Sequence, residues 1–339
     1  MSKLLKPIKL GNLEIKNRIV MPPMCTYMAK ESGKVRSFHR YHYVSRAIGG
    51  VGFIIVEATA VEERGRISNF DLGLWDDNQI KSHTKLTKDI HKFGAKVALQ
   101  LAHSGRKCEC VNCKSVAPSP IRFSQSYNKP KELSLKEIAN VRENFLKAAK
   151  RAVLAGYDMV EIHAAHGYLL HEFLSPLTNE RKDEYGSSFE NRVRLLCEIM
   201  DDFSKSDISF GVRISADEWE NGGFGIEDSK NLAKILESLG AKYIHVSAGG
   251  NHPKPALMPD IEPLYQANYA KEIKSVVNVP VIAVGLITTI DEGEKLLNEK
   301  YCDMVAYGRE LLRNPNLALY AQAKSSSSDD IFSAYKRAF

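Results

Sequence analysis

The sequence of 339 residues contains no hydrophobic run long enough to cross a membrane. Its apolar segments stop at about ten residues, whereas a spanning helix needs about twenty. The first residues, MSKLLKPIKL, are charged and lack the apolar stretch of a secretory signal. We therefore expect a protein that is neither embedded in a membrane nor exported, which makes the cytoplasm its expected location.

An excess of charge of one sign is also missing. The 47 Lys and Arg against 41 Asp and Glu leave a net charge of +6, spread along the chain. No arginine-rich or aromatic-interleaved cluster of the kind that binds nucleic acid is present, so we expect no nucleic-acid partner. The mild positive charge is compatible with a phosphorylated small ligand. The content of 44% hydrophobic and 26% charged residues is typical of a globular protein with a sizeable core.

Cysteine is sparse, and without a signal peptide its six copies are expected to be thiols rather than a disulfide framework. Three of them, Cys108, Cys110 and Cys113, lie together in the polar segment CECVNC, which reads as a loop. Three thiols could bind zinc, but a fourth ligand is not evident and the spacing is not a standard one. We favour incidental or redox-labile thiols over a metal site.

Eight short apolar segments recur, most of them ending in small or polar residues and followed by a helical pattern. The segments are residues 18–24, 51–61, 96–103, 159–162, 210–216, 243–248, 279–285 and 304–308. Helical patterns are expected at 38–48, 86–93, 141–152, 192–203 and 227–239. This alternation predicts an α/β protein with a single (β/α)8 TIM barrel over residues 1–324 and a short tail over 325–339. A doubly wound sheet is the alternative, but no GxGxxG follows the first strand.

In such a barrel, chemistry belongs at the carboxyl ends of the strands. The residues there are Cys25, Ala58, Gln100, His103, His163, His166, Arg213, Ser247, Gly285, Gly308 and Arg309. Gly285 and the Gly308-Arg309 pair follow the last two strands, where barrels commonly bind phosphate. Arg213 is expected inside the barrel mouth, with an anionic ligand or, alternatively, a structural ion pair to Glu57 or Glu161.

The segment EIHAAHGY, residues 161–168, holds the densest set of reactive side chains. Side chains alternate along a strand, so His163 and His166 can converge only if the chain turns between them, which Ala164, Ala165 and Gly167 permit. Two imidazole N–H groups could then bind one oxygen, and Tyr168 could supply a proton. For an isolated HxxH, a packed core pair is the more common situation. Metal binding is weakly indicated because no third ligand lies beside the pair.

Taken together, the motifs make the chain resemble the Old Yellow Enzyme family of FMN-dependent ene-reductases, in particular its bacterial, thermophilic-like branch. The resemblance extends from Pro7 to Phe339 and is carried by KNRIVMPPMCTY, IVEATAV, LQLAHSGRK, EIHAAHGYLLHEFLSPLTNERKDEYG, VRIS and YGRELLRNP. Two features depart from the family pattern. Ser187 replaces a usual glycine, and the CECVNC insertion lies in a loop expected to overhang the site.

The resemblance implies FMN bound across the barrel mouth. Its ring would lie among Pro22, Pro23, Met24, Cys25, Ala58, Gln100 and Arg213, and its phosphate would lie at Gly285, Gly308 and Arg309. His163 and His166 match the pair that holds the substrate oxygen, and Tyr168 matches the proton donor. Tyr27 matches a substrate contact, Cys25 a residue that tunes the flavin, and Lys107 a position near the active site.

The reaction implied is reduction of FMN by NAD(P)H and then hydride transfer to the β-carbon of an activated alkene. Suitable alkenes are unsaturated carbonyl, imide or nitro compounds. Alternatives are another FMN-barrel oxidoreductase acting on quinones or nitro compounds, a non-redox barrel enzyme, and a flavin-binding protein without turnover. The ending YKRAF resembles a tail whose arginine enters a neighbouring subunit's active site. Arg337 is therefore expected to line a partner's substrate pocket in a homodimer or homotetramer.

Overall fold

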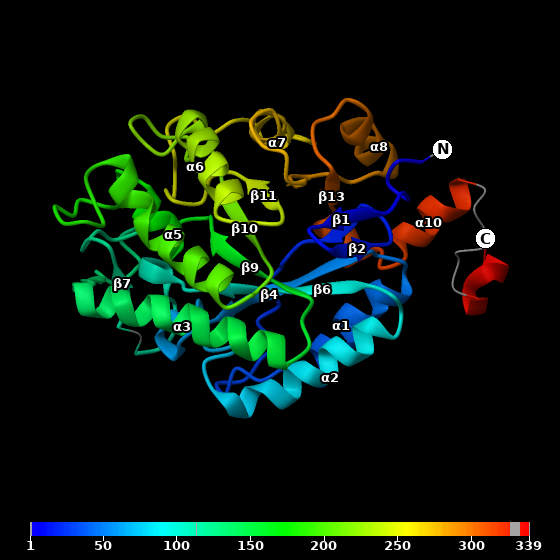
Figure 1. The fold of residues 1–339 in the computed structure, drawn as a ribbon, viewed down its shortest axis with the longest axis horizontal. Coiled ribbons are helices and arrows are strands. Elements are labelled where there is room, and N and C mark those ends of the chain that lie inside the picture. The colour runs from blue at the N-terminus through cyan, green and yellow to red at the C-terminus, as the bar shows by residue number, and fades with distance from the viewer. Residues whose placement is uncertain (1, 113, 326–332, 339) are drawn as a thin grey trace.

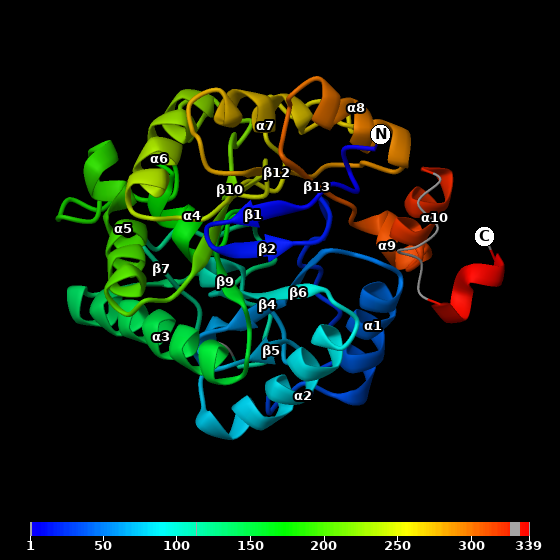
Figure 2. The same ribbon diagram turned by 45° about the vertical axis from the view of Figure 1, so that its right-hand side comes forward.

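Eight parallel strands form a closed barrel in the computed structural model, which describes residues 2–112, 114–325 and 333–338 (Figures 1 and 2). The strands are β3 (Ile19–Met21), β4 (Phe53–Ala60), β6 (Lys96–Ala102), β9 (Met159–Ala164), β10 (Phe210–Ser215), β11 (Ile244–Ser247), β12 (Val281–Ala283) and β13 (Met304–Ala306). The order β3-β13-β12-β11-β10-β9-β6-β4 closes when β3 pairs with β4 through Val20↔Phe53 and Met21↔Ile54. The expected (β/α)8 barrel is confirmed.

Helices cover the outside of the barrel (Figure 2). They are α1 (Ser37–Ile48), α2 (Ile80–His91), α3 (Leu135–Leu154), α4 (Leu169–Leu174), α5 (Phe189–Lys205), α6 (Ile226–Ser238), α7 (Ala267–Lys274), α8 (Ile290–Asn298), α9 (Arg309–Arg313) and α10 (Leu317–Lys324). Short 3-10 turns lie at Glu63–Gly65, Asp77–Gln79, Gly105–Lys107 and Ser333–Ala338. Among the described residues, no helix combines the length and the apolar character that a membrane span requires.

Helix α3 shows how the sequence pattern sets the packing. Ser134 caps its amino end by accepting a hydrogen bond from Glu137 N, and the Glu137 side chain accepts one back from Ser134 N. Apolar residues three and four apart then form one buried face, as expected from their spacing: Ile138, Val141, Phe145, Ala148, Ala149 and Ala152. Burial of this face against the barrel holds α3 beside β6 and β9.

Two predicted strands were too long, because proline or glycine interrupts the hydrogen bonding between strands. The first strand stops at Met21 rather than at residue 24, because Pro22 and Pro23 have no N–H to donate. The seventh covers only Val281–Ala283, between Pro280 and Gly285, whose φ is +130°. The pattern did not reveal two small sheets, β1 (Ile8–Leu10) with β2 (Leu13–Ile15) and β7 (Val116–Ala117) with β8 (Lys131–Glu132). It also did not reveal the short strand β5 (Leu72–Gly73), which pairs with β4 in the barrel sheet.

The β1–β2 hairpin crosses one end of the barrel (Figure 2). Its Leu10 and Ile15 are fully buried in a cluster with inward-facing strand residues, among them Phe53 and Met304. Burying such a side chain contributes about 1.5–3 kcal/mol. The hairpin therefore seals the amino end, and the opposite end of the barrel carries the polar residues.

Strand register sets the level of those polar residues. Arg213 on β10 pairs with His163 on β9 and with His245 on β11. Two residues further along, Ser215 pairs with Ser247. Parallel pairing in this register brings residues that are far apart in sequence to one height at the carboxyl end.

Candidate functional site

A cavity of about 300 Å³ opens at the carboxyl ends of the last strands. Nine residues predicted from the sequence line it: Pro22, Pro23, Met24, His166, Arg213, Ser247, Gly285, Gly308 and Arg309. Tyr265, Gln266, Leu286, Ile287 and Thr288 complete much of the wall. The structure therefore gathers the predicted phosphate-binding residues and the predicted arginine around one space.

Two glycines shape the cavity end after β12 and β13. Gly285 has a φ of +130°, and a Cβ there would come within 2.8 Å of Gln266 Cβ. A Cβ on Gly308 would point toward Pro22 and Met24, at 3.8 and 3.7 Å, so a side chain would enter the cavity. Glycine at both positions therefore leaves space beside cavity-lining residues that a side chain would occupy.

Arg213 is the most deeply placed cation of the site, with a relative exposure of 8%. Its Nε is buried without a hydrogen-bond partner among the described residues. Burial lowers the pKa of Arg213, and the nearby Glu161 opposes that shift. An enclosed guanidinium with an unpartnered N–H is costly, so the geometry favours a ligand that accepts from it.

Neither carboxylate proposed as an ion-pair partner is available to Arg213. Glu161 accepts hydrogen bonds from Gln100 (2.8 Å), Tyr243 (3.2 Å) and His245 (3.0 Å). Glu57 accepts from Thr26 N at 2.8 Å and from the Tyr43 hydroxyl at 3.1 Å. No ion pair of Arg213 occurs in the part of the chain that the structure describes, so the alternative of a structural ion pair is wrong.

His163, His166 and Tyr168 come together as the sequence predicted. The centroid of the His163 ring lies 5.2 Å from that of the His166 ring and 5.1 Å from that of the Tyr168 ring. The turn is sharp, because His166 has a φ of 59° and Gly167 one of 72°. Tyr168 then directly precedes the short helix α4. The three side chains thus form one cluster beside the cavity.

The two histidines differ in their polar contacts. His163 is buried, and its Nδ1 has no hydrogen-bond partner among the described residues. His166 Nε2 lies 2.8 Å from Ser247 Oγ, and its backbone N–H donates to Ser215 Oγ at 2.9 Å. Burial, followed by the charge of Arg213, lowers the pKa of both imidazoles well below the usual value. Both rings are therefore neutral at pH 7, and each carries one N–H.

Lys107 lies where the resemblance placed it, next to this cluster. Its Nζ donates to His166 O at 2.9 Å and to Gly250 O at 3.1 Å, and lies 5.0 Å from the centroid of the Tyr168 ring. Burial is the main cause that lowers the pKa of Lys107 to about 8. Its side chain therefore ties the histidine turn to the neighbouring loop.

Cys25, in the segment after β3, and Ala58, on β4, border the same cluster. Cys25 packs with Ala58 and Tyr168, and it shares a side-chain hydrogen bond with Tyr27. Burial and two nearby carboxylates raise the pKa of the Cys25 thiol, which keeps it neutral. Tyr27 has a relative exposure of 46% and a φ of 54°, so its ring is open to solvent. Gln100 lies deeper, where its amide donates to Glu161.

The cysteine-rich loop corrects one prediction. Cys108 is disulfide-bonded, so the expectation of thiols is wrong at this position. Cys110 is a free thiol that contacts Arg66 O at 3.7 Å, and Cys113 lies outside the described residues. The described chain contains no group of three His, Cys, Asp or Glu arranged to hold a metal ion.

His103, also predicted at a strand end, contacts a carboxylate: its Nε2 lies 2.8 Å from Glu62 Oε1.

Several site residues were not predicted, although one signal could have found them. Tyr265 and Gln266 line the cavity from the loop between β11 and α7, and Ser215 ends β10. The rule that barrel sites lie on the loops after the strands points to these segments. It does not say which residue of a long loop turns inward.

Arg337 lies apart from this cluster. Residues 333–338 form a 3-10 turn outside the barrel, beside α10 (Figures 1 and 2), and Arg337 is exposed. The expectation that it enters a partner's site stays a prediction.

Known proteins resemble this chain in both sequence and structure. A sequence model of the family described as NADH:flavin oxidoreductase / NADH oxidase matches residues 3–327. The chain is 43% identical over 342 residues to an NADPH dehydrogenase of Clostridium acetobutylicum, covering 99% of each protein. It is 44% identical over 341 residues to an NADPH dehydrogenase of Listeria monocytogenes, covering 100% of each. Among solved structures it resembles the old yellow enzyme homologue from Zymomonas mobilis, at 28% identity and a TM-score of 0.81, over 96% of this chain and 93% of that one.

Proposed function

Because the chain belongs to the NADH:flavin oxidoreductase / NADH oxidase family, which includes Old Yellow Enzyme, we propose that it is an FMN-dependent ene-reductase. Membership makes it an oxidoreductase that uses FMN with NAD(P)H as the reductant. The proposed substrate is an alkene activated by a carbonyl, imide or nitro group. One observation carries this choice: the buried, unpartnered Nδ1 of His163 lies in a cluster with His166 and Tyr168.

The residues at the cavity fit FMN. The unpartnered Nε of Arg213 suits the polar edge of the isoalloxazine ring, where a cation favours the negative charge of the reduced form. Gly285, Gly308 and Arg309 would hold the phosphate in the space that a Cβ on Gly308 would enter. Pro22, Pro23, Met24, Cys25, Ala58 and Gln100 are the proposed ring contacts. When bound, FMN takes a hydride from NAD(P)H and supplies one to the substrate.

His163 and His166 are the proposed donors to the substrate oxygen. A neutral imidazole offers one N–H, and hydrogen bonds to a carbonyl or nitro oxygen draw electron density from the β-carbon. Charge that develops on this oxygen during hydride transfer strengthens the same bonds, so the contact favours the transition state. The neutral state of both rings means that they donate hydrogen bonds without transferring a proton.

Tyr168 is the proposed acid that protonates the α-carbon. Burial raises the pKa of its phenol well above the usual value, so the proton is retained at neutral pH until it is transferred. Tyr27, exposed on the open side of the site, is the proposed further contact to the substrate.

The experiment that tests the proposal compares the wild-type protein with a His163→Ala, His166→Ala double variant. Wild-type protein is expected to be yellow and to oxidise NADPH when 2-cyclohexenone is added, with cyclohexanone as the product. The double variant is expected to keep its flavin absorbance but to lose enone turnover by about a hundredfold or more, together with the long-wavelength band that phenols produce.

His91→Ala is the matched control, since His91 pairs with Asp158 away from the site and is expected to leave turnover unchanged. A double variant that is folded, yellow and fully active would contradict the roles of the histidines. A wild-type protein that binds FMN but reduces no activated alkene would contradict the proposed substrate class.

A further inference from the structure

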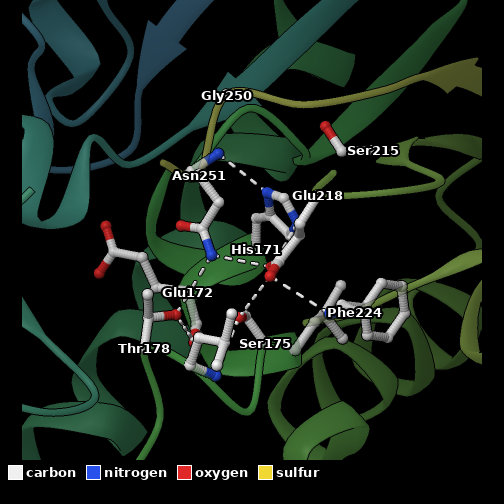
Figure 3. A network of polar contacts seen from close by, with 12 residues as sticks. His171, Glu172, Ser175, Thr178, Ser215, Glu218, Phe224, Gly250 and Asn251 are labelled. Atoms are coloured by element: carbon white, nitrogen blue, oxygen red, sulfur yellow. Dashed lines mark hydrogen bonds and ion pairs between the residues drawn. The ribbon is translucent and has the colours of Figure 1, made fainter. Parts of the chain in front are cut away.

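A fully buried carboxylate, that of Glu218, lies in a network of polar contacts with His171, Ser175 and Asn251 (Figure 3). Glu218, in the loop after β10, accepts hydrogen bonds from Asn251 Nδ2 at 2.8 Å, Ser175 Oγ at 2.9 Å and Phe224 N at 3.2 Å. His171 Nε2 lies 3.2 Å from Glu218 Oε1, a looser contact than the other three. Burial alone would raise the pKa of Glu218, but the neighbouring His171, followed by Ser175 Oγ and Phe224 N, lowers it, so the group is a charged anchor.

His171 connects this anchor to the catalytic segment. Its Nδ1 accepts the backbone N–H of Gly167 at 2.9 Å, and the side chain has no exposure to solvent. A nitrogen that accepts carries no proton, so the ring proton is on Nε2, which lies 3.2 Å from Glu218 Oε1 without the alignment of a hydrogen bond. The charge of the carboxylate favours this tautomer, in which His171 can hold Gly167.

The segment that is held is strained. His166 has a φ of 59°, in the left-handed region that a residue with a Cβ rarely adopts. A Cβ on Gly167 would come within 2.4 Å of Gly250 O, so the turn is packed tightly against the loop after β11. Such a turn persists only where its surroundings fix it. Ser215 and Lys107 hold its His166 end, and His171 is the contact to Gly167.

A second cation ties the same loops together. Arg106 donates to Asn251 O at 2.6 Å, and Asn251 in turn donates to Glu218. Three segments, those after β6, β10 and β11, thus meet beneath α4, which carries His171. Arg106, His171, Glu218 and Asn251 do not line the cavity. Their effect on a ligand therefore passes through the turn at His166 and Gly167.

We propose that His171 and Glu218 are positioning residues, which fix the Gly167 amide and through it the aim of His166 and Tyr168 at the substrate. This inference rests on the proposed function, since the substrate is the activated alkene of that reaction. Misplacing a catalytic group by about 1 Å can cost about a hundredfold in rate. We therefore expect loss of the contact between His171 and Gly167 to affect substrate binding and turnover more than folding.

Two substitutions at one position separate the two contacts of His171. His171→Asn keeps an acceptor where Nδ1 lies but cannot reach Glu218. His171→Gln keeps a donor where Nε2 lies but offers Gly167 no acceptor. Both variants replace the imidazole ring with a smaller amide group. Each is therefore the packing control for the other.

The measurements use the FMN-loaded protein. For His171→Gln we expect about tenfold weaker phenol binding, read from the long-wavelength band, and at least tenfold lower kcat/KM with 2-cyclohexenone. The amide of residue 167 should exchange hydrogen faster. His171→Asn should stay within about threefold of wild type in all three measurements. The two variants should have equal flavin content and equal melting temperatures.

Equal phenol binding and turnover in the two variants would overturn the proposal, whether both match wild type or both fall together with stability. If His171→Gln does not fold, Glu218→Gln carries the test. It should also weaken phenol binding with flavin retained, and wild-type binding in that variant would overturn the proposal. Failure of the proposed function would appear in the wild-type enzyme as absent enone turnover. Phenol binding and amide exchange would still report on the turn.

Discussion

The polar side chains at the barrel mouth differ in charge: several are neutral, and Arg213 is positive. The buried imidazoles of His163 and His166 are neutral because burial and Arg213 both disfavour a second proton. The phenol of Tyr168 and the thiol of Cys25 are also neutral because burial disfavours their anions. Arg213 therefore supplies the positive charge at this level of the barrel, which is what an anionic ring edge requires.

The acid role of Tyr168 predicts that a phenylalanine there slows only one half-reaction. For Tyr168→Phe, oxidation of the enzyme by an enone should slow by about tenfold or less, because water can replace the phenol as the acid. Reduction by NADPH should be unchanged. Stopped-flow absorbance of the flavin measures the two halves separately. A slower reduction by NADPH would show that Tyr168 has a different role.

A carboxylate beside the site makes stability depend on pH. Burial alone would raise the pKa of Glu62, but its hydrogen bond and charge interaction with His103, and those with Arg64, lower it to about 2. A folded-state pKa below the unfolded value means that Glu62 stabilises the protein above about pH 4.5. This contribution is lost as the pH falls from about 4.5 to about 2.

Glu62→Gln should therefore lower the urea midpoint at pH 7 by more than it does at pH 3.5. Glu63→Gln is the matched control, since Glu63 is mostly exposed and pairs with Arg66 at the surface. Its effect should be small at both pH values. An equal loss at the two pH values for Glu62→Gln would mean that packing, and not charge, is responsible.

At the scale of the element, local signals and tertiary packing act together in α3. The cap at Ser134 fixes where the helix begins, and the buried face fixes which side meets the barrel. Ser134→Ala removes the acceptor for Glu137 N and should lower the free energy of unfolding by about 1 kcal/mol.

The measurement is urea denaturation followed by circular dichroism. Ser238→Ala is the control, because Ser238 lies in the last turn of α6 and bonds only to Ile235 O within that helix among the described residues. A loss of equal size in both variants would mean that the cap does not contribute at Ser134.

At the scale of the whole molecule, the site is open on the side of Tyr27, which is exposed in the single chain. The prediction that a partner's Arg337 enters this side leads us to expect a dimer or tetramer in light scattering. Arg337→Ala should raise KM for the enone severalfold with FMN still bound. Deletion of residues 331–339 should act in the same direction and leave the barrel folded.

Lys336→Ala is the control for this prediction, since Lys336 is a neighbouring exposed cation in the same 3-10 turn. A monomer at assay concentration, with full activity after the deletion, would rule out a shared site. Equal effects of the two single substitutions would indicate a general loss of charge instead of a specific contact.

The sequence by itself determined the barrel and most of the candidate site. Buried strands alternate with one-sided helices, and these periods depend only on neighbours in the chain, so they can be read without the fold. The same holds for EIHAAHGY, where His163, His166 and Tyr168 lie within six residues. Arg213, Gly285 and Gly308 follow from the rule that barrel sites lie at the carboxyl ends of strands.

Only the tertiary structure decided which buried polar groups have a hydrogen-bond partner and which do not. Whether Arg213 had Glu57 or Glu161 as its partner depended on the register of strands far apart in sequence. The β1–β2 seal, the disulfide at Cys108 and the bond of His171 to Gly167 likewise have no periodic signature. Buried polar contacts among loops depend on how several segments meet in space, and the local pattern of each segment does not contain that information.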